Sequence, residues 1–422
     1  MTKDDIIKAA FKVWGRDLYR TTSLTQIALE LGVSKPALYR HFKDKNALLS
    51  AMDTAYFDDC AGFIKAGYDR AVSTEDRHES DLIIMRTISE YYIRNMDAFI
   101  FSLTRVYDSR NREITNAEFI LRGINFGLLT ERKKGASFYP SGNQLVIATI
   151  VYCIAQFHRG NDKPRETPAE DDVKRILVQI ENLIIKGLEL DAGKVASLDF
   201  RLLEEQATRS VPDDTEENAL LRAVAEAVAE AGPWNASMEM VARRSGLSKS
   251  GLYAHFKNRQ DMLGQLFIAE FTRIVNFAKI QIETSNVPEE QLYMAIMAIV
   301  NYLRSRPEIL TAMDWIKTRN LDLGKEVPAR LYRIIHDIKL EAIQKYDQHL
   351  LVWIAQWILF LIINALAWWP GLESSAGSDK NLSYAGPGES KNWAKNVFKV
   401  PNECFHILFN FIALGLGGLN NE

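Results

Sequence analysis

The stretch SKPALYRHFKDK at residues 34–45 returns as SKSGLYAHFKNR at residues 248–259. Seven of the twelve positions are identical, and the offset of 214 residues is about half of the 422-residue chain. Both versions open with a serine, which is favoured at helix N-termini, and continue with basic and aromatic residues. The repeat predicts that one small helical element occurs twice in this chain.

Helical periodicity extends outward from both versions. Apolar residues recur at spacings of three and four from Asp4 to Trp14 and again from Leu220 to Val228, as on one face of an amphipathic helix. Strand-like alternation and tight hairpin turns are scarce. We therefore expect an all-α protein.

A short helix and a tight turn precede each repeated stretch. In the first half, Ser23 and Gln26 form the pattern of a capping box. Gly32 marks the helix end, and Ser34 is expected to cap the helix that follows. Two short helices joined by a glycine-containing turn of about three residues form a helix-turn-helix. The second half repeats this order around Gly246.

The similarity continues behind the helix-turn-helix. YYIRNMDAFIFSL from Tyr91 is similar to NYLRSRPEILTAM from Asn301, at an offset of 210 residues. IAQF at 154–157 recurs as IAQW at 354–357, at an offset of 200. Loop insertions and deletions explain these shrinking offsets, so we expect two tandem copies of one unit. The expected parts are a first head at 1–50, a first body at 51–203, a linker at 204–215, a second head at 216–264 and a second body at 265–422.

The capped helix, the glycine turn and VSKPALYRHFKDKNALL at residues 33–49, followed by a long helix, resemble the N-terminal domain of TetR-family transcriptional regulators. Members of this family are normally homodimers in which each chain has one DNA-binding head and one helical ligand-binding body. The resemblance implies a regulator, most often a repressor, that a small-molecule effector releases from DNA by changing the spacing of its heads. Two such units would be fused here into a single-chain pseudo-dimer.

A recognition helix places its N-terminal residues against base edges in the major groove, while Lys, Tyr and His side chains donate to phosphates. The resemblance assigns the phosphate contacts to the matching Tyr and Lys in particular. The candidate DNA-binding residues are Thr22, Thr25, Lys35, Pro36, Ala37, Tyr39, Arg40, His41 and Lys43 in the first copy, and Ser237, Lys249, Ser250, Gly251, Tyr253, His255 and Lys257 in the second.

The two heads differ in charge. Residues 1–50 carry nine Lys or Arg against five Asp or Glu, whereas residues 216–264 carry six of each kind. Ala254 also stands where the first copy has Arg40. The first head therefore has the larger net positive charge and should attract DNA more strongly. The second head is either a weaker DNA-binding element or a scaffold that no longer binds.

Composition argues against several classes of function. The net charge is −3, so contact with nucleic acid must come from a local patch. Three widely spaced cysteines and the lack of CxxC or HExxH spacing predict a reduced, cytoplasmic chain without a metal site. No catalytic constellation stands out, and LGLGG at 414–418 follows a helix rather than a strand. We expect no enzymatic activity and no cofactor.

One apolar run permits two interpretations. Residues 350–369, LLVWIAQWILFLIINALAWW, are long and apolar enough for a transmembrane helix. The counterpart at 145–160, LVIATIVYCIAQFHRG, is shorter and ends in charge. The shared IAQ favours an interface helix of a soluble body, which is apolar all round because it is buried on every side. A membrane-associated protein that uses 350–369 is the alternative.

In the favoured interpretation, helices near 143–158 and 170–189 pack against helices near 348–369 and 401–416. The expected partners are an asymmetric double-stranded DNA operator and a small-molecule effector, with no membrane, and the chain is monomeric, with a homodimer as the alternative. A helical sensor or partner-binding protein in which only the first head binds DNA is a second possible function. Candidates for the effector pocket are Tyr92, Phe99, Tyr107, Phe126, Tyr302 and Trp315, although such aromatic residues are more often part of the core.

Overall fold

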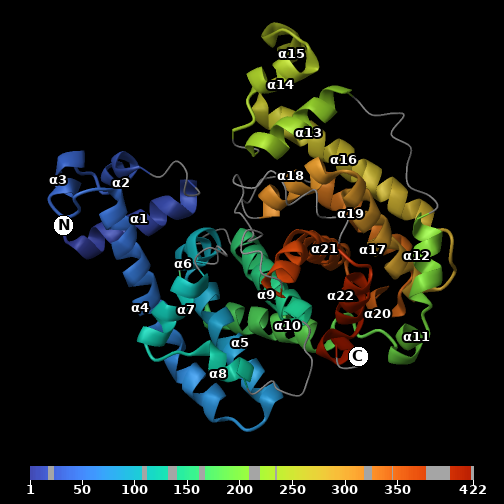
Figure 1. The fold of residues 1–422 in the computed structure, drawn as a ribbon, viewed down its shortest axis with the longest axis horizontal. Helices are drawn as coiled ribbons and strands as arrows, with labels where there is room; N and C mark the ends of the chain where they lie inside the picture. Colours follow the sequence, from blue (N-terminus) through green and yellow to red (C-terminus); the bar gives the residue numbers. More distant parts are fainter. Residues whose placement is uncertain are drawn as a thin grey trace. The chain divides into compact units, whose positions relative to one another are not determined.

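The structure, a computed structural model, describes residues 1–17, 23–106, 112–131, 140–160, 167–208, 219–232, 235–317, 326–344, 346–376 and 400–419. Throughout these residues the regular secondary structure is helical and no strand occurs (Figure 1). The predicted all-α fold class is confirmed. Contacts divide the chain into two compact units, here the first unit (Met1–Ser137 and Cys153–Glu181) and the second unit (Phe138–Tyr152 and Asn182–Glu422).

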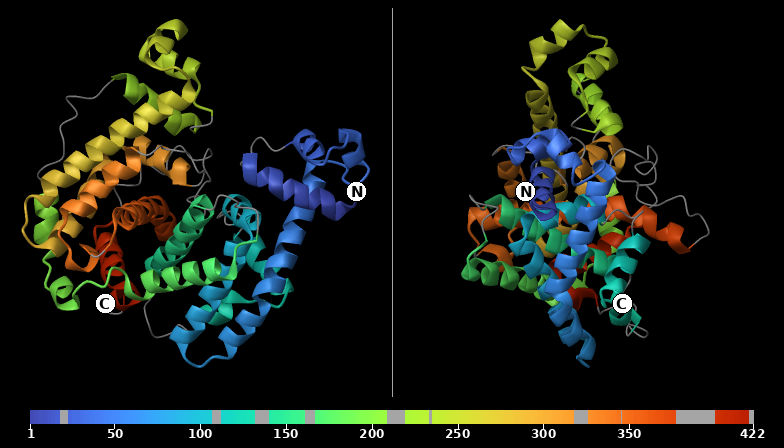
Figure 2. Two further views of the ribbon diagram at one scale, coloured as in Figure 1. Left: turned by 180° about the vertical axis from the view of Figure 1, so that it is seen from behind. Right: turned by 90° about the vertical axis from the view of Figure 1, so that its left-hand side faces the viewer.

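The first unit begins with the first head and continues into α4, the long blue helix in Figure 2. Asp44 caps α4, since its carboxylate accepts a hydrogen bond from Ala47 N at 2.7 Å. The helices of this unit are α1 (Lys3–Asp17), α2 (Leu24–Glu30), α3 (Lys35–Tyr39), α4 (Lys45–Ser73), α5 (Arg77–Arg94), α6 (Met96–Phe101), the π-helical turn η1 (Ser102–Val106), α7 (Arg112–Leu121), α8 (Phe126–Glu131) and parts of α9 (Pro140–Gly160) and α10 (Glu170–Lys186).

Aromatic residues connect α1, α4 and α6 in the core of the first unit. Trp14, Tyr56 and Phe101 are almost completely buried. The ring centroid of Phe101 lies 5.2 Å from that of Trp14 and 5.5 Å from that of Tyr56. Aromatic pairs at such distances contribute about 0.5–1.5 kcal/mol each beyond their buried area. The first head is therefore attached to its body by packing as well as by the backbone of α4.

The second unit is built around the paired helices α16 and α17. In Figures 1 and 2, α14 and α15 lie at the N-terminal end of α16, away from the helices of the second body. The helices of this unit are α11 (Ala192–Ala196), α12 (Phe200–Thr208), α13 (Ala219–Ala231), α14 (Met238–Ser245), α15 (Lys249–His255), α16 (Arg259–Ile282), α17 (Pro288–Ser305), α18 (Pro307–Lys317), α19 (Glu326–Asp337), α20 (Glu341–Gln344), α21 (Gln348–Ala376), α22 (Glu403–Leu414) and the 3-10 helix η5 (Gly415–Leu419), together with parts of α9 and α10.

Segments of the first copy pack against the second copy within this second unit. On α9, Thr149 Oγ1 accepts a hydrogen bond from Trp357 Nε1 at 3.1 Å, and Tyr152 OH donates to Trp353 O at 2.8 Å. The rings of Tyr152 and Trp353 also stack edge to face, with centroids 5.0 Å apart. These are contacts between the predicted interface helices of the two copies.

Glycines allow a close backbone approach between the end of α10 and the end of α22. A Cβ at Gly187 would lie 2.4 Å from Ile412 O, and one at Gly415 would lie 2.4 Å from the carbonyl carbon of Ile185. Both glycines have positive φ, +59° and +62°. Leu188 N donates to Ile412 O at 2.8 Å across the same approach. The glycine-rich stretch at 414–418 therefore has a packing role, since only glycine tolerates both the space and the conformation.

The linker expected at 204–215 overlaps α12, because residues 204–208 are helical; residues 209–215 lie outside the described residues. The Glu204 carboxylate accepts hydrogen bonds from Tyr293 OH at 2.7 Å, Asn402 Nδ2 at 3.0 Å and His406 Nε2 at 2.6 Å. The polar composition predicted a linker. These long-range donors on α17 and α22 fix the start of the segment to the second body instead.

Among the described residues one helix is long and apolar enough to cross a membrane, Gln348–Leu366 in α21, with a mean hydropathy of 2.0. Of this segment, 61% is buried inside the protein. Trp357 and Leu361 are completely buried. This enclosure favours the interpretation of α21 as a core and interface helix.

Candidate nucleic-acid interface

Buried residues set the geometry of the first head. Leu38 is completely buried and Phe42 is 6% exposed, so one face of α3 is fixed against the rest of the head. The predicted capping box is confirmed: Gln26 N donates to Ser23 Oγ at 3.2 Å, and Ser23 N donates to Gln26 Oε1 at 2.7 Å. Gly32 takes φ +65° in the turn between α2 and α3. Sequence and structure therefore agree on a helix-turn-helix.

The capping role predicted for Ser34 is wrong in one respect. Ser34 occupies the N-cap position of α3, but its side chain makes no capping hydrogen bond. Only its backbone contributes, because Ala37 N donates to Ser34 O at 2.9 Å. Pro36 in the first turn lacks an N–H, so this helix end has one donor fewer to satisfy.

The outer face of α3 carries the predicted DNA-contacting side chains. Tyr39 is 46% exposed, and Lys35 Nζ lies 6.0 Å from the centroid of its ring. This pair of a cation and an aromatic hydroxyl suits a phosphate group, which accepts hydrogen bonds from both. Thr22 lies outside the described residues. Of the other candidates, Thr25, Lys35, Pro36, Tyr39, Arg40 and Lys43 are exposed, and Ala37 and His41 are half-buried.

The second head repeats this arrangement with a better-capped recognition helix. Leu252 and Phe256 are buried, whereas Tyr253 is 48% exposed. Ser248 Oγ accepts a hydrogen bond from Gly251 N at 3.0 Å, and Gly246 ends α14 with φ +70°. Of the candidates in this copy, Ser237, Lys249, Ser250, Tyr253, His255 and Lys257 are exposed, and Gly251 is half-buried.

Ser237 has a structural role alongside its predicted contact with DNA. Its Oγ accepts a hydrogen bond from Met240 N at 3.2 Å and so caps α14. A hydroxyl group can still donate its own proton while it accepts one. Capping and donation to a phosphate are therefore compatible at this position.

The electrostatics of the two heads differ at equivalent positions. Arg244 in α14 forms ion pairs with Glu226 and Glu230, so its charge is offset within the head. Glu239 is exposed in the first turn of α14, at the position that Thr25 occupies in α2. A carboxylate there repels phosphate, whereas a threonine hydroxyl can donate to it. Glu239 was missed in the sequence analysis, although the offset of 214 residues identifies it.

The pocket candidates of the first body fall into two separate groups. The rings of Tyr92 and Phe99 have centroids 5.7 Å apart, and Tyr92 OH lies 2.6 Å from Tyr56 OH in the buried interior. Phe126 instead packs against Phe119, at 5.3 Å, and Tyr68. The structure thus brings Tyr92 and Phe99 together and places Phe126 in another cluster; Tyr107 lies outside the described residues.

In the second body, Tyr302 is held by a buried carboxylate. Its hydroxyl donates to Glu270 Oε2 at 2.6 Å, and Arg273 Nη1 donates to Glu270 Oε1 at 2.7 Å. Burial raises the pKa of the Tyr302 hydroxyl, and the neighbouring carboxylate raises it further. Tyr302 is therefore a neutral donor with a fixed partner. Trp315 lies on α18, but its side chain is outside the described residues.

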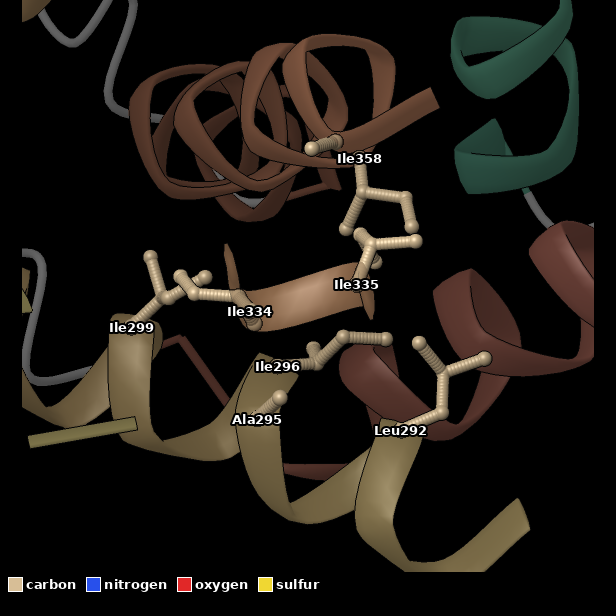
Figure 3. A pocket seen from close by; sticks show the side chains of 8 residues that line it. Leu292, Ala295, Ile296, Ile299, Ile334, Ile335 and Ile358 are labelled. Atoms are coloured by element: carbon tan, nitrogen blue, oxygen red, sulfur yellow. The ribbon is translucent and has the colours of Figure 1, made fainter. Parts of the chain in front are cut away.

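A cavity of about 20 Å³ lies among α17, α19 and α21 of the second body (Figure 3). A space of that size is on the order of one water molecule. All of its lining residues are apolar, so nothing in the lining would hold a water by hydrogen bonds. They are Leu292, Ala295, Ile296, Ile299, Ile334, Ile335, Ala355 and Ile358.

Comparison with known proteins identifies both heads. The family model described as bacterial regulatory proteins, tetR family, matches residues 6–52 and residues 220–266. The solved structure of a transcriptional regulator FadR from Bacillus subtilis in complex with stearoyl-CoA is similar at 17% identity, over 45% of this chain and 96% of that chain, with a TM-score of 0.31.

A second solved structure, of the fatty acid degradation regulator FadR from Bacillus halodurans, is similar at 16% identity, over 47% of this chain and 96% of that one, also with a TM-score of 0.31. None of the curated proteins matches. The two segments that the family model matches coincide with the two helix-turn-helix elements, so the predicted duplication of the head is confirmed.

Proposed function

Because the chain is a tandem TetR-family protein, with that family's DNA-binding domain at residues 6–52 and again at 220–266, we propose that it regulates transcription by binding a specific DNA operator as a single-chain pseudo-dimer. In this proposal it acts as a repressor in the cytoplasm, and a small-molecule effector releases it from DNA. The family is one of transcription regulators, and the proposal assigns the chain no enzymatic role.

One observation carries the proposal: both heads expose the same side chains on a helix whose other face is buried. Tyr39 and Tyr253 are each nearly half exposed, beside Leu38 and Leu252, which are completely buried. An aromatic core residue would not be left in solvent twice at equivalent positions. A tyrosine hydroxyl that donates to a DNA phosphate accounts for this exposure.

Contacts between the two copies support the pseudo-dimer. Thr149 and Tyr152 of the first copy hydrogen bond to Trp357 and Trp353 of the second, and α10 approaches α22 closely at Gly187. In a homodimer such contacts would join two chains. Here one chain supplies both partners at high effective concentration, so a further dimer is not required. We expect sedimentation to show a monomer of 48.0 kDa at micromolar concentration, and a species of twice that mass at every concentration would count against the pseudo-dimer.

The function itself can be tested by selecting bound DNA from a random pool with the full-length chain. Enrichment of one defined sequence, followed by a salt-dependent shift of that DNA in a gel, supports the proposal. The effector is then sought among small molecules that abolish the shift. If no sequence is enriched above the starting pool, the protein is not a sequence-specific regulator.

A second candidate function, a sensor in which only the first head binds DNA, is favoured by one specific observation. The second head has no net charge, and it presents Glu239 where the first presents Thr25. The two functions predict different sites. A sensor with one active head selects a single half-site, whereas the pseudo-dimer selects two half-sites at a fixed spacing.

A further inference from the structure

The two bodies differ at positions that line the cavity of the second body. Ile299 and Ile358 both line that cavity, as Figure 3 shows. The sequence repeat around Tyr91 and Asn301 has an offset of 210, which places Ser89 at the position of Ile299. The repeat of IAQ has an offset of 200, which places His158 at the position of Ile358. Two apolar cavity residues of the second body are therefore replaced by two polar residues in the first.

Both polar residues are buried and incompletely hydrogen bonded. Ser89 is 0% exposed and His158 is 6% exposed. Ser89 Oγ and His158 Nδ1 each lack a hydrogen-bond partner among the described residues. Leaving a buried polar group unpaired is unfavourable, so such groups are rare in folded proteins and each needs an explanation. Two of them, at positions that line one cavity in the sister copy, point to a bound molecule.

The hydrogen bonding of His158 determines whether that molecule must donate or accept a hydrogen bond. His158 Nε2 lies 2.9 Å from Tyr92 O. A carbonyl oxygen can only accept, so Nε2 carries the proton and Nδ1 of the neutral ring is left as an acceptor. Burial lowers the pKa of His158, which keeps the ring neutral. The missing partner of Nδ1 is therefore a hydrogen-bond donor. Ser89 lies about one helical turn before Tyr92 on α5, so its hydroxyl is on the side of α5 that His158 contacts and can donate to the same molecule.

Two aromatic rings lie beside the imidazole of His158. Its centroid lies 5.9 Å from that of Phe99 and 5.5 Å from that of Phe157, and the rings of Phe99 and Tyr92 are also in contact. A charged ligand would be poorly solvated in such surroundings, whereas a flat apolar molecule packs well against aromatic faces.

We propose that the first body holds the effector site, and that this site takes a neutral aromatic molecule whose hydroxyl group donates to His158 Nδ1 and accepts from Ser89 Oγ. This inference rests on the proposed function, because it names the chemistry of the effector. In the second body, isoleucines at both positions remove the polar groups, and Tyr302, three residues after Ile299, already donates its hydroxyl to the Glu270 carboxylate. That body is a structural partner and binds no effector.

A matched pair of probes tests the chemistry directly. 2-Naphthol and 2-methoxynaphthalene have the same ring system, but only the first can donate a hydrogen bond. Equilibrium dialysis of the full-length chain against each probe should show about tenfold tighter binding of 2-naphthol, the size expected for hydrogen bonds made in a dry site. Equal binding of the two probes, or no binding of either, overturns the inference.

Variants locate the site. His158→Phe keeps a flat ring but removes the Nδ1 acceptor together with the donor to Tyr92 O, and Ser89→Ala removes the hydroxyl. Each should abolish most of the preference for 2-naphthol. Ile299→Val and Ile358→Val, at the equivalent positions of the second body, should leave it unchanged. Unfolding midpoints within a few degrees of that of the unmodified chain show that the variants are folded.

The DNA-binding activity separates the two proposals. All four variants should shift the selected DNA as the unmodified chain does in the absence of probe, since none of them lies in a head. If the DNA shift is absent from the unmodified chain, the proposed function fails. If the shift is present but the preference for 2-naphthol survives in both His158→Phe and Ser89→Ala, only the location of the effector site is wrong.

Discussion

The two bodies have a buried hydrogen bond at equivalent positions, with the same length but with different partners. In the first, Tyr56 OH and Tyr92 OH lie 2.6 Å apart. In the second, Glu270 stands at the position of Tyr56 and accepts from Tyr302 OH, also at 2.6 Å. The tyrosine pair needs no charge, whereas the buried carboxylate depends on cationic neighbours such as Arg273.

The heads show the same kind of divergence. Thr25 and Arg40 in the first correspond to Glu239 and Ala254 in the second. In a homodimer one gene sequence supplies both halves, so every substitution appears twice. A fused pair is free of that restriction. Duplication within one chain therefore allows the two halves to keep a common fold while their side chains diverge in chemistry.

The largest expected effect concerns the buried carboxylate. Glu270→Ala leaves Arg273 and Tyr302 without their partner, so we expect the free energy of unfolding to fall by about 3–5 kcal/mol. Tyr56→Phe, the equivalent change in the first body, removes one neutral hydrogen bond and should cost about 1 kcal/mol. Chemical denaturation followed by circular dichroism measures both. Equal losses would show that the two sites are energetically alike in spite of their chemistry.

A smaller effect is expected at the contact that fixes α12 to the second body. Burial would raise the pKa of Glu204, but hydrogen bonds from Tyr293, Asn402 and His406 outweigh it and hold the pKa below its ordinary value of 4.5. Glu204→Gln weakens these charge-assisted bonds and should lower the stability at pH 7 by about 1.5–3 kcal/mol.

The pH dependence follows from the direction of that shift. A lowered pKa in the folded state contributes stability that is fully present above the unfolded value and is lost as pH falls through the folded value. The difference between the unmodified chain and Glu204→Gln should therefore shrink as pH falls below about 4.5. Glu205→Gln, a change at an exposed neighbour, is the control and should show little difference. A difference that stays constant down to pH 3 contradicts the assignment.

Changes in the heads should alter DNA affinity by a lesser amount. Lys43→Ala and Tyr39→Phe should each weaken binding on all sequences by about 1 kcal/mol or more, because phosphate contacts do not depend on base identity. Lys257→Ala and Tyr253→Phe are the matched changes in the second head and should have smaller effects. Gel shifts across a salt series give both the affinities and the salt slopes. Losses from the second pair that equal or exceed those from the first would reverse the ranking of the heads.

The smallest expected effect is an increase in DNA affinity. Glu239→Thr gives the second head the residue of the first head and removes a charge that repels phosphate, so affinity should rise by about two- to fivefold at low salt. Thr25→Glu should have the opposite effect in the first head. The effects of both substitutions on DNA affinity should be smaller at high salt, where exposed charges are screened. If Glu239→Thr weakens binding, the carboxylate makes a favourable contact in the complex.

The sequence predicts those parts of the molecule that depend on local signals. Periodic apolar residues, the capping box at Ser23 and the glycine turns are sufficient for both helix-turn-helix elements. The docking of Glu204 could not be predicted in this way, because its donors lie far away in the chain, on α17 and α22. The burial of Ser89 and His158 could not be predicted, because the sequence alone does not distinguish a buried polar residue on a helix from a solvent-exposed one.

Three DNA duplexes test whether the two heads bind different halves of one operator. One is the site obtained by selection, and the other two are palindromes made by doubling each half of it. Arg40 can contact guanine or a phosphate, whereas Ala254 can do neither, so the half-sites should differ in sequence. A wrong base in the Arg40 half should cost about 1–3 kcal/mol and one in the other half distinctly less. We expect the asymmetric site to bind most tightly of the three. Equally tight binding of either palindrome would contradict it, because the heads would then not distinguish the two halves.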